Sequence, residues 1–268
     1  VSDVVITAFD DYGVHVTGES TAGLDLANIE VDGTAAYSSA VGLYVYDNSE
    51  GPSMTVDGGS FHDLSRGVYV YNSHVDFSKT IFAHSGDGAY VRSSTSGSYY
   101  TNFDYCTFYG NDDAIDIYQG SSYYYVYVDV TNSVFGENDY CIRRTSSYSP
   151  QSITFTNNLW WGGTLASGVS LSPSSGNLNY DGLLADPANG DYEPTDRSPA
   201  RYYSPSDPAG TLGAVEHAGA STGSGMHGFW YVNHTFSTDS VTEVSGDVVI
   251  TSGATMTFLP GAELHIDK

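Results

Sequence analysis

The sequence predicts an all-β protein built as a parallel β-helix, a solenoid in which short strands stack in successive coils. Segments of similar composition recur every 21 to 29 residues along most of the chain. The strand-like runs are short, rich in β-branched and aromatic residues, and bounded by Gly, Asn, Asp and Ser. No long window has the i, i+3, i+4, i+7 apolar spacing that an amphipathic helix requires.

The repeat is clearest in residues 88–138, where two consecutive segments follow the same order. Each has an alternating run, a polar turn, a second run, and an aromatic residue followed closely by Gly and Asn. A unit of about 25 residues cannot bury its apolar face alone, but it can when stacked on its neighbours. A propeller needs blades of about 40 residues, and a sandwich would not repeat the same residue types at one place in every unit.

Alternation in the opening strand of each unit predicts which side chains face the core. The first apolar residues of these strands, of which the first six should point inward, are Val14, Leu43, Val68, Ala89, Ile115, Ile142 and Val169. The following residues should form one outward column, namely His15, Tyr44, Tyr69, Tyr90, Asp116 and Arg143. Two residues further on, a second outward column should contain Thr17, Tyr46, Tyr71, Arg92 and Tyr118. A repeated aromatic position comprises Phe61, Phe82, Phe108, Phe135 and Trp160.

Other residues are interpreted as structural. Asparagines at the turns suit left-handed backbone positions and local side-chain hydrogen bonds; they are Asn72, Asn111, Asn132, Asn138, Asn157 and Asn158. Trp160-Trp161-Gly162-Gly163 is expected to end the regular coils and cap the last one. Cys106 and Cys141 occupy different places in their units, which favours two small core thiols over a disulfide.

Residues 166–216 have a different texture, with fewer strand-like runs and more Pro, Ser and Gly. Their order of Leu183–Tyr192, Ser198-Pro199-Ala200 and Gly213–Glu216 resembles the closing segment of bacterial secreted right-handed parallel β-helix proteins of the pectate-lyase-like superfamily. The resemblance covers roughly residues 1–216 and implies a right-handed coil. It is specific for the fold and weak for activity, because that superfamily contains lyases, hydrolases, adhesins and filament-like surface proteins.

The chain therefore divides into three predicted parts. Residues 1–216 form the β-helix with its closing segment, and residues 217–228 are small and flexible enough for a linker. Residues 229–268 resemble the first coil of a second β-helix, or a strand-exchange segment. Because the sequence begins in a strand and ends inside such a coil, we expect either a piece of a longer tandem protein or a subunit completed by its neighbours through strand addition. The second alternative predicts a head-to-tail filament.

Composition restricts the partners of the protein. Lys and Arg total 8 against 32 Asp and Glu, for a formal charge of -24. Nucleic acids and anionic membrane surfaces are excluded as partners because both require a basic footprint, and no apolar run is long enough for membrane insertion. Cations, calcium above all, are the expected counter-species, although an acidic surface also serves solubility alone. The 23 tyrosines, with abundant Ser, Thr, Gly and Asn, suit an extracellular or cell-surface location.

The best candidate for chemistry lies on the outward columns of the middle coils, where Asp116 should approach Arg92 and Arg143. Four carboxylates that precede these strands offer calcium ligands: Asp87, Asp112, Asp113 and Asp139. The resemblance implies that calcium would neutralise a uronate carboxylate while a basic residue removes the adjacent proton. The competing interpretation is an ion-pair ladder, with Asp116 between the two arginines.

Six outward tyrosines form the second candidate: Tyr44, Tyr46, Tyr69, Tyr71, Tyr90 and Tyr118. They stabilise the sheet through cross-strand pairs, or offer a flat platform to sugar rings, or form a contact strip between copies. Two hypotheses of function follow. The first is an extracellular structural or adhesive module of a surface or filament-forming protein, needing no cofactor, with itself or polysaccharide as partner. The alternative is a secreted, calcium-dependent polysaccharide lyase or hydrolase acting on an acidic glycan.

Overall fold

The computed structural model describes residues 1–18, 24–34, 39–46, 54–150, 152–195, 198–200, 211–215, 226–230, 233–250 and 254–266. Within these residues strands dominate, and the helical content is a single turn of 3-10 helix at Pro187–Asn189. None of the described residues belongs to a helix with the length and apolar character needed to cross a membrane.

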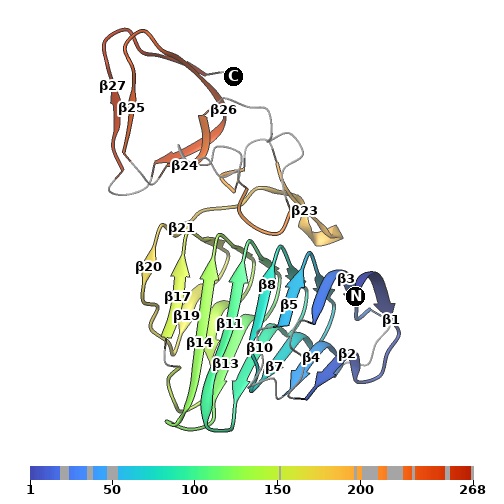
Figure 1. The fold of residues 1–268 in the computed structure, drawn as a ribbon. Coiled ribbons are helices and arrows are strands. Elements are labelled where there is room, and N and C mark those ends of the chain that lie inside the picture. The colour runs from blue at the N-terminus through green and yellow to red at the C-terminus, as the bar shows by residue number, and fades with distance from the viewer. Residues whose placement is uncertain are drawn as a thin grey trace.

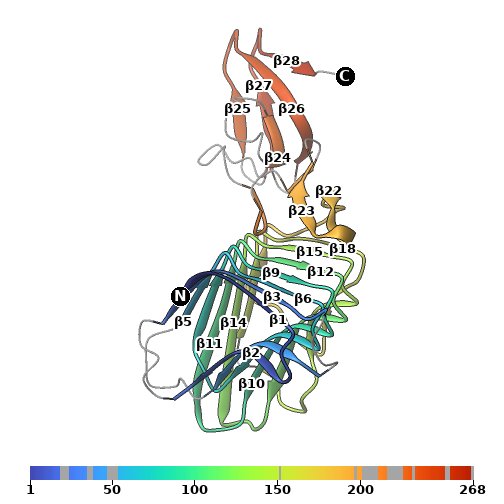
Figure 2. The same cartoon turned by 90° about the vertical axis from the view of Figure 1, so that its right-hand side faces the viewer.

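The strands stack as a parallel solenoid with three faces, and each regular coil adds one strand to each face (Figures 1 and 2). On the first face these are β2 (Tyr12–Thr17), β4 (Val41–Tyr46), β7 (Arg66–Tyr71), β10 (Asp87–Ser93), β13 (Asp113–Gln119), β16 (Tyr140–Arg144) and β19 (Thr164–Ser167). On the second they are β5 (Met54–Asp57), β8 (Val75–Ser78), β11 (Gly97–Asp104), β14 (Tyr124–Thr131), β17 (Ser152–Thr156) and β20 (Ser174–Ser175). On the third they are β6 (Ser60–His62), β9 (Ile81–Ala83), β12 (Thr107–Tyr109), β15 (Val134–Gly136), β18 (Leu159–Trp161) and β21 (Leu178–Asn179).

The long strand β3 (Asp25–Asp32) joins the second and third faces. Its first part pairs with β5 and its last part with β6, so one strand turns the corner between the two faces. Strand β1 (Ser2–Thr7) pairs in parallel with β3 and extends the stack. The predicted all-β parallel β-helix is therefore confirmed.

The strand register confirms both outward columns of the first face. His15 lies opposite Tyr44, Tyr44 opposite Tyr69, and the column continues through Tyr90 and Asp116 to Arg143. The second column runs in the same way from Thr17 to Tyr118. The six predicted inward residues from Val14 to Ile142 share one row, and all of them are buried or packed against the core.

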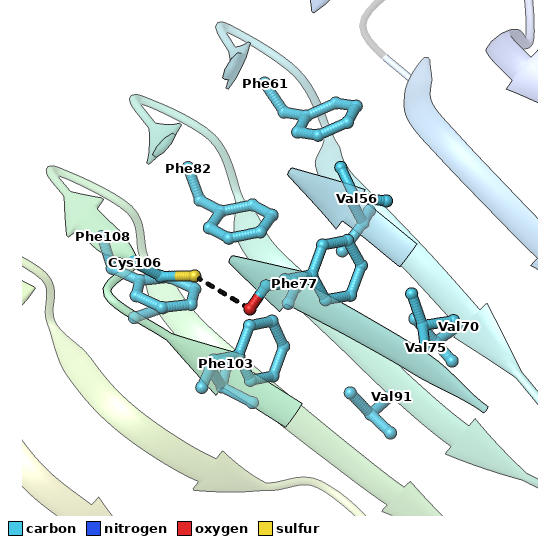
Figure 3. Close-up of a cluster of buried hydrophobic side chains, with 14 of the residues drawn as sticks. Val56, Phe61, Val70, Val75, Phe77, Phe82, Val91, Phe103, Cys106 and Phe108 are labelled. Atoms are coloured by element: carbon cyan, nitrogen blue, oxygen red, sulfur yellow. Dashed lines mark hydrogen bonds between the residues drawn. The ribbon is translucent and has the colours of Figure 1, made fainter. Parts of the chain in front are cut away.

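The core is filled by stacked phenylalanines. The rings of Phe61, Phe82, Phe108 and Phe135 follow one another with centroids 5.9, 4.7 and 4.7 Å apart. Figure 3 shows the first three of these rings in a row, with Phe77 and Phe103 beside them. The same residue type recurs at one place in each coil because parallel strands stack at about the thickness of an aromatic pair.

Asparagines satisfy the backbone at the corner that follows the third face. The side chain of Asn111 donates to the carbonyl of Phe82 at 3.0 Å, and that of Asn138 donates to the carbonyl of Phe108 at 3.0 Å. The two asparagines also bond to each other, at 2.9 Å. Both are buried, so these bonds replace the water that a turn would otherwise require, which confirms their structural interpretation.

Two predictions about the end of the solenoid are wrong. The row of inward residues continues from Ile142 to Ala166, and Val169 lies beyond β19. The pair Trp160-Trp161 lies within β18, and the coil of β19, β20 and β21 follows it, so these rings do not cap the last coil. The hydrophobic pattern misled because Val169 resembles a strand residue, whereas Ala166 is small enough to be overlooked.

The closing segment returns over the third face. Strands β22 (Leu184–Asp186) and β23 (Asp191–Pro194) form an antiparallel pair around the 3-10 turn. Further along, Leu212 packs with Val134 and Leu159, and the N–H of Ala214 donates to the Thr107 hydroxyl at 2.9 Å. The segment therefore covers β12, β15 and β18.

A separate group of strands follows, coloured orange to red in Figure 1. It comprises β24 (Met226–Trp230), β25 (His234–Phe236), β26 (Val241–Ile250), β27 (Met256–Phe258) and β28 (Glu263–Ile266). Pairing is parallel in the order β24-β26-β28 and between β25 and β27, as in a solenoid. Of the predicted linker, residues 217–225 lie outside the described residues, and residues 226–228 already belong to β24.

Candidate functional site

The first face carries a continuous row of aromatic rings across neighbouring coils, in which the rings of Tyr12 and Tyr44 are stacked and those further along are tilted or edge-on to each other. Ring centroids are 4.9 Å apart between Tyr12 and Tyr44, 4.9 Å between Tyr44 and Tyr69, and 4.9 Å between Tyr69 and Tyr90. The second column adds Tyr46 and Tyr71, whose ring centroids are 5.1 Å apart. The separations of Tyr44, Tyr69 and Tyr90 equal the spacing of parallel strands because these three residues occupy one column of the register, whereas Tyr12 lies opposite Val41. We call this surface the tyrosine face.

Two arginines are inserted among these rings. The Arg66 guanidinium lies 4.2 Å from the Tyr90 ring centre. Arg92 lies 5.0 Å from both the Tyr71 and the Tyr118 rings, and its Nη1 donates to the Tyr69 hydroxyl at 3.3 Å. Cation–π contacts of this kind favour a guanidinium lying flat on the aromatic surface. Among the described residues, Arg92 has no carboxylate within ion-pair distance, and its contacts are with tyrosine rings and the Tyr69 hydroxyl.

Exposure varies along the tyrosine face. Tyr12 and Tyr46 are 40% and 37% exposed, whereas Tyr90 is buried at 8%. Burial, together with neighbouring tyrosines, raises the pKa of Tyr44 to about 12, and burial likewise raises the pKa of Tyr90 to about 12. These phenols therefore stay neutral at ordinary pH and keep their O–H donors.

A cluster of three carboxylates adjoins the tyrosine face on β10 and β13. Asp87, Asp113 and Asp116 each offer one oxygen, and these oxygens lie within 4.8 Å of one another. Register explains the convergence, because Asp87 lies opposite Asp113, and Asp116 lies opposite Tyr90 in the same pair of strands. We call these residues the carboxylate cluster.

Two of the three carboxylates are neutralised by arginines. Arg66 donates from Nε to Asp87 at 2.8 Å, and Arg143 donates to both oxygens of Asp113 at 3.1 and 3.3 Å. Burial still raises the pKa of both carboxyls above the usual value, and the arginines oppose that shift. The cluster thus combines desolvation with incomplete charge compensation.

Asp116 differs from the other two. It is 5% exposed, its Oδ2 accepts from the Thr145 hydroxyl at 3.0 Å, and its buried Oδ1 has no hydrogen-bond partner. Burial raises the pKa of Asp116 to about 6, with the negative charge of Asp87 as the next cause. A buried, unsatisfied oxygen beside two other carboxylates is suited to bind a cation or to hold a proton.

The structure brings together some of the predicted site residues and separates others. Asp116 forms no ion pair with either arginine, because Arg143 reaches back to Asp113 and Arg92 lies on tyrosine rings; the predicted ion-pair ladder through Asp116 is wrong. The calcium ligands Asp112 and Asp139 were predicted to join Asp87 and Asp113, but their side chains are exposed and outside the carboxylate cluster. Asp112 contributes only its negative charge to the neighbouring carboxyls.

Sequence reasoning missed Arg66 and Thr145. Arg66 lies opposite Asp87, which in turn lies opposite Asp113, so all three occupy one column. Aligning the residue that precedes Gly67, Gly88 and Ala114 reveals this column without a structure. Thr145 lies just past the end of β16, where the alternating pattern no longer predicts direction.

The carboxylate cluster fits a hard cation such as calcium in the nature of its donors, since all three are carboxylate oxygens and one is buried without a partner. Asp87, Asp113 and Asp116 would hold the ion. Bound there, a divalent cation supplies positive charge for an anionic ligand group next to the tyrosine face.

Comparison with known proteins agrees with this architecture. The family model described as right handed beta helix region matches residues 2–181, well over half of the 268-residue chain. No curated protein and no solved structure matches the chain. The matched range begins with β1 and ends just after β21, so it coincides with the three-faced solenoid. The chain therefore belongs to the right-handed β-helix family.

Proposed function

We propose that the protein is an extracellular structural or adhesive β-helix module of a surface or filament-forming protein, and that its tyrosine face binds polysaccharide. The observation that carries the proposal is the row of rings from Tyr12 to Tyr90, with neighbouring centroids 4.9 Å apart. Sugar rings present apolar faces edged by hydroxyls. A row of partly exposed phenols with neutral O–H donors offers both apolar contact and hydrogen bonds to such faces.

Substitution on two faces tests this proposal. Soluble polysaccharide in a gel should slow the migration of the unaltered protein. We expect the double variant Tyr44→Ala, Tyr69→Ala to lose this retardation, because two adjacent rings are removed. The matched control is Tyr100→Ala with Tyr127→Ala, which removes a neighbouring pair of tyrosine rings on the second face, with centroids 4.5 Å apart. Retardation that survives the first double substitution, or that only the control abolishes, contradicts the proposed site.

Assembly of copies is the second part of the proposal. Within the described residues, β2 and β28 each have a strand neighbour on one side only, so each offers free backbone groups for strand addition. Exposed apolar side chains accompany these ends, with Val5 65% and Ile266 69% exposed. Negative-stain electron microscopy should show head-to-tail filaments of the purified protein. Dispersed single rods at high concentration and in calcium contradict this part.

A specific observation favours a hydrolase as the alternative function. Asp116 has a pKa of about 6 and lies next to two further carboxylates at the edge of the tyrosine face. A carboxyl with a raised pKa keeps its proton in mildly acidic solution and is suited to donate it to a leaving glycosidic oxygen, while a neighbouring carboxylate acts as base or nucleophile. A lyase is less well supported, because Arg143 and Arg66 are held in ion pairs and Arg92 lies on tyrosine rings.

Reducing-end release from acidic glycans tests the alternative. An active protein should lose at least 100-fold of its rate in Asp116→Asn, which keeps the size of the side chain but cannot donate the proton in the same way. Asp139→Asn, an exposed carboxylate outside the cluster, is the control and should retain full activity. The same assay with a calcium chelator added tests whether calcium is required. If none of the acidic glycans is cleaved, the hydrolase alternative is contradicted and the proposal of a binding module stands.

A further inference from the structure

A second cluster of titratable side chains lies on the third face, away from the tyrosine face. The closing segment covers β12, β15 and β18 but leaves a cavity of about 590 Å³ over β3, β6 and β9. Its lining includes Glu30, His62, Asp63, His84, Asn189 and Tyr192. Within the described part of the chain no Lys or Arg lines it, and its charged lining residues Glu30 and Asp63 are acidic.

His62 is the centre of this cluster. It ends β6 and lies opposite Asp32 of β3 in the sheet register. Its Nδ1 is 2.9 Å from Asp63 Oδ2 and 3.8 Å from Asp32 Oδ1, while its Nε2 is 3.5 Å from Glu30 Oε1. Both ring nitrogens therefore face carboxylates.

This arrangement is unbalanced without a further cation. A neutral imidazole has one N–H donor and one lone pair, whereas an ionised carboxylate only accepts. One ring nitrogen must then direct its lone pair at carboxylate oxygens. The backbone N–H of Thr34 donates to Asp32 Oδ1 at 2.7 Å and helps to fix the position of this carboxylate. A metal ion bound between the groups would supply the missing positive charge.

We propose that Asp32, His62 and Asp63 form a site for a divalent transition-metal ion of the zinc type. One ligand atom from each residue lies within 4.8 Å of the others. Donors about 2.1 Å from a tetrahedral zinc ion lie about 3.4 Å apart, and the separations of His62 Nδ1 from the two carboxylates, 2.9 and 3.8 Å, bracket that value. The imidazole ligand selects zinc-like ions over calcium and magnesium, which prefer oxygen donors only.

Glu30 has a distinct role as a positioning residue. A metal-bound histidine commonly donates its other ring N–H to a carboxylate, which fixes the tautomer and the orientation of the ring. With a metal bound, Glu30 would accept the N–H of Nε2, and Nδ1 would bind the metal in place of its present 2.9 Å contact with Asp63. Three protein ligands leave one coordination position for water or a small ligand, and His62 and Asp63 both border the cavity.

Calorimetric titration of the metal-stripped protein with zinc chloride tests the site. We expect His62→Ala to weaken zinc binding at least 100-fold and Glu30→Ala to weaken it 10- to 100-fold. Asp63→Asn removes a ligand charge while retaining a residue that tolerates the left-handed backbone at this position, where φ is 59°. The matched control is His84→Ala, which lines the same cavity but bonds to the carbonyl of Pro187; it should bind within twofold of the unaltered protein.

Zinc X-ray absorption supplies a readout independent of affinity. The loaded protein should show one imidazole in the zinc coordination shell, and His62→Ala should show none. Circular dichroism of the metal-stripped variants checks that each is folded. Unchanged zinc affinity in His62→Ala, or a shell of oxygen donors alone, overturns the proposal.

Discussion

At the residue scale, the three carboxylates of the carboxylate cluster differ only in their partners. Asp87 and Asp113 each receive an arginine, whereas Asp116 receives one hydroxyl and keeps an unsatisfied oxygen. The repeat places the three side chains close together, but it does not decide which of them pairs with an arginine. Asp116 is therefore the residue whose charge is least compensated in the folded protein.

Neutralising Asp116 should stabilise the protein at alkaline pH. The pKa of Asp116 is about 6 in the folded state against an ordinary 3.8, so between these values the folded state binds more protons and its stability falls as the pH rises. Asp116→Asn should raise the free energy of unfolding by about 2 kcal/mol at about pH 8 and change it little at about pH 4. Denaturant titrations at both values measure this, and equal effects at the two pH values would contradict it.

The two cysteines should be unreactive in the folded protein. Both are free and buried, as predicted from the sequence. Burial raises the pKa of Cys141 to about 12 and also raises the pKa of Cys106, so neither supplies thiolate at neutral pH. A thiol reagent should modify neither in native buffer and both in denaturant. Rapid labelling of the native protein would show that the coils open locally.

At the element scale, each coil contributes the same types of side chain to the same rows. The phenylalanine row, the asparagine corner and the tyrosine face all follow from parallel stacking. Close stacking also explains Gly67, whose Cβ replacement would lie 2.5 Å from the carbonyl oxygen of Gly88 in the next coil. Backbone contact between coils thus selects glycine at that strand entrance.

The phenylalanine row should dominate the stability of the middle coils. Phe108 is fully buried, and its ring centroid is 4.7 Å from those of Phe82 and Phe135. Phe108→Ala should lower the free energy of unfolding by about 3–5 kcal/mol, because the coils cannot close over the lost ring. The control is Tyr123→Ala at a residue 72% exposed, with a change within about 0.5 kcal/mol. A loss below about 1 kcal/mol for Phe108→Ala would mean that the row repacks.

At the scale of the whole molecule, charge opposes the compact state. The formal charge is -24, while arginine–carboxylate ion pairs are few: in the described part of the chain they are Arg66–Asp87 and Arg143–Asp113. Repulsion among exposed carboxylates acts over the Debye length, about 30 Å at 0.01 M salt and about 3 Å at 1 M. Repulsion among the carboxylates therefore destabilises the folded solenoid. The same negative potential attracts cations to the carboxylate cluster and to the acidic group around His62.

Salt should stabilise the molecule. Raising sodium chloride from about 0.01 M to about 0.5 M should raise the midpoint of thermal unfolding, because screening weakens repulsion more than it weakens two ion pairs. Calcium chloride at matched ionic strength separates screening from binding at the carboxylate cluster: an additional rise that Asp113→Asn abolishes indicates binding. A midpoint that falls with sodium chloride would show that attractive pairs dominate instead.

The sequence by itself determined the parallel solenoid, its outward columns and its phenylalanine row. These depend on alternation and repeat length, which are local properties that any one coil imposes on the next. Even Arg66 was accessible in this way, since it occupies the column of Asp87 and Asp113. The exact end of the coils was not, because a small residue such as Ala166 carries little pattern.

Only the tertiary structure decided which partners the charged side chains choose. Long, flexible arginines reach diagonally between coils, so Arg143 pairs with Asp113 although Asp116 is its direct neighbour. The cavity at His62 lies between the solenoid and a segment more than 100 residues later in the chain, since His62 and Tyr192 both line it. Such contacts depend on the positions of segments that are distant in the sequence, and a repeat pattern does not specify those positions.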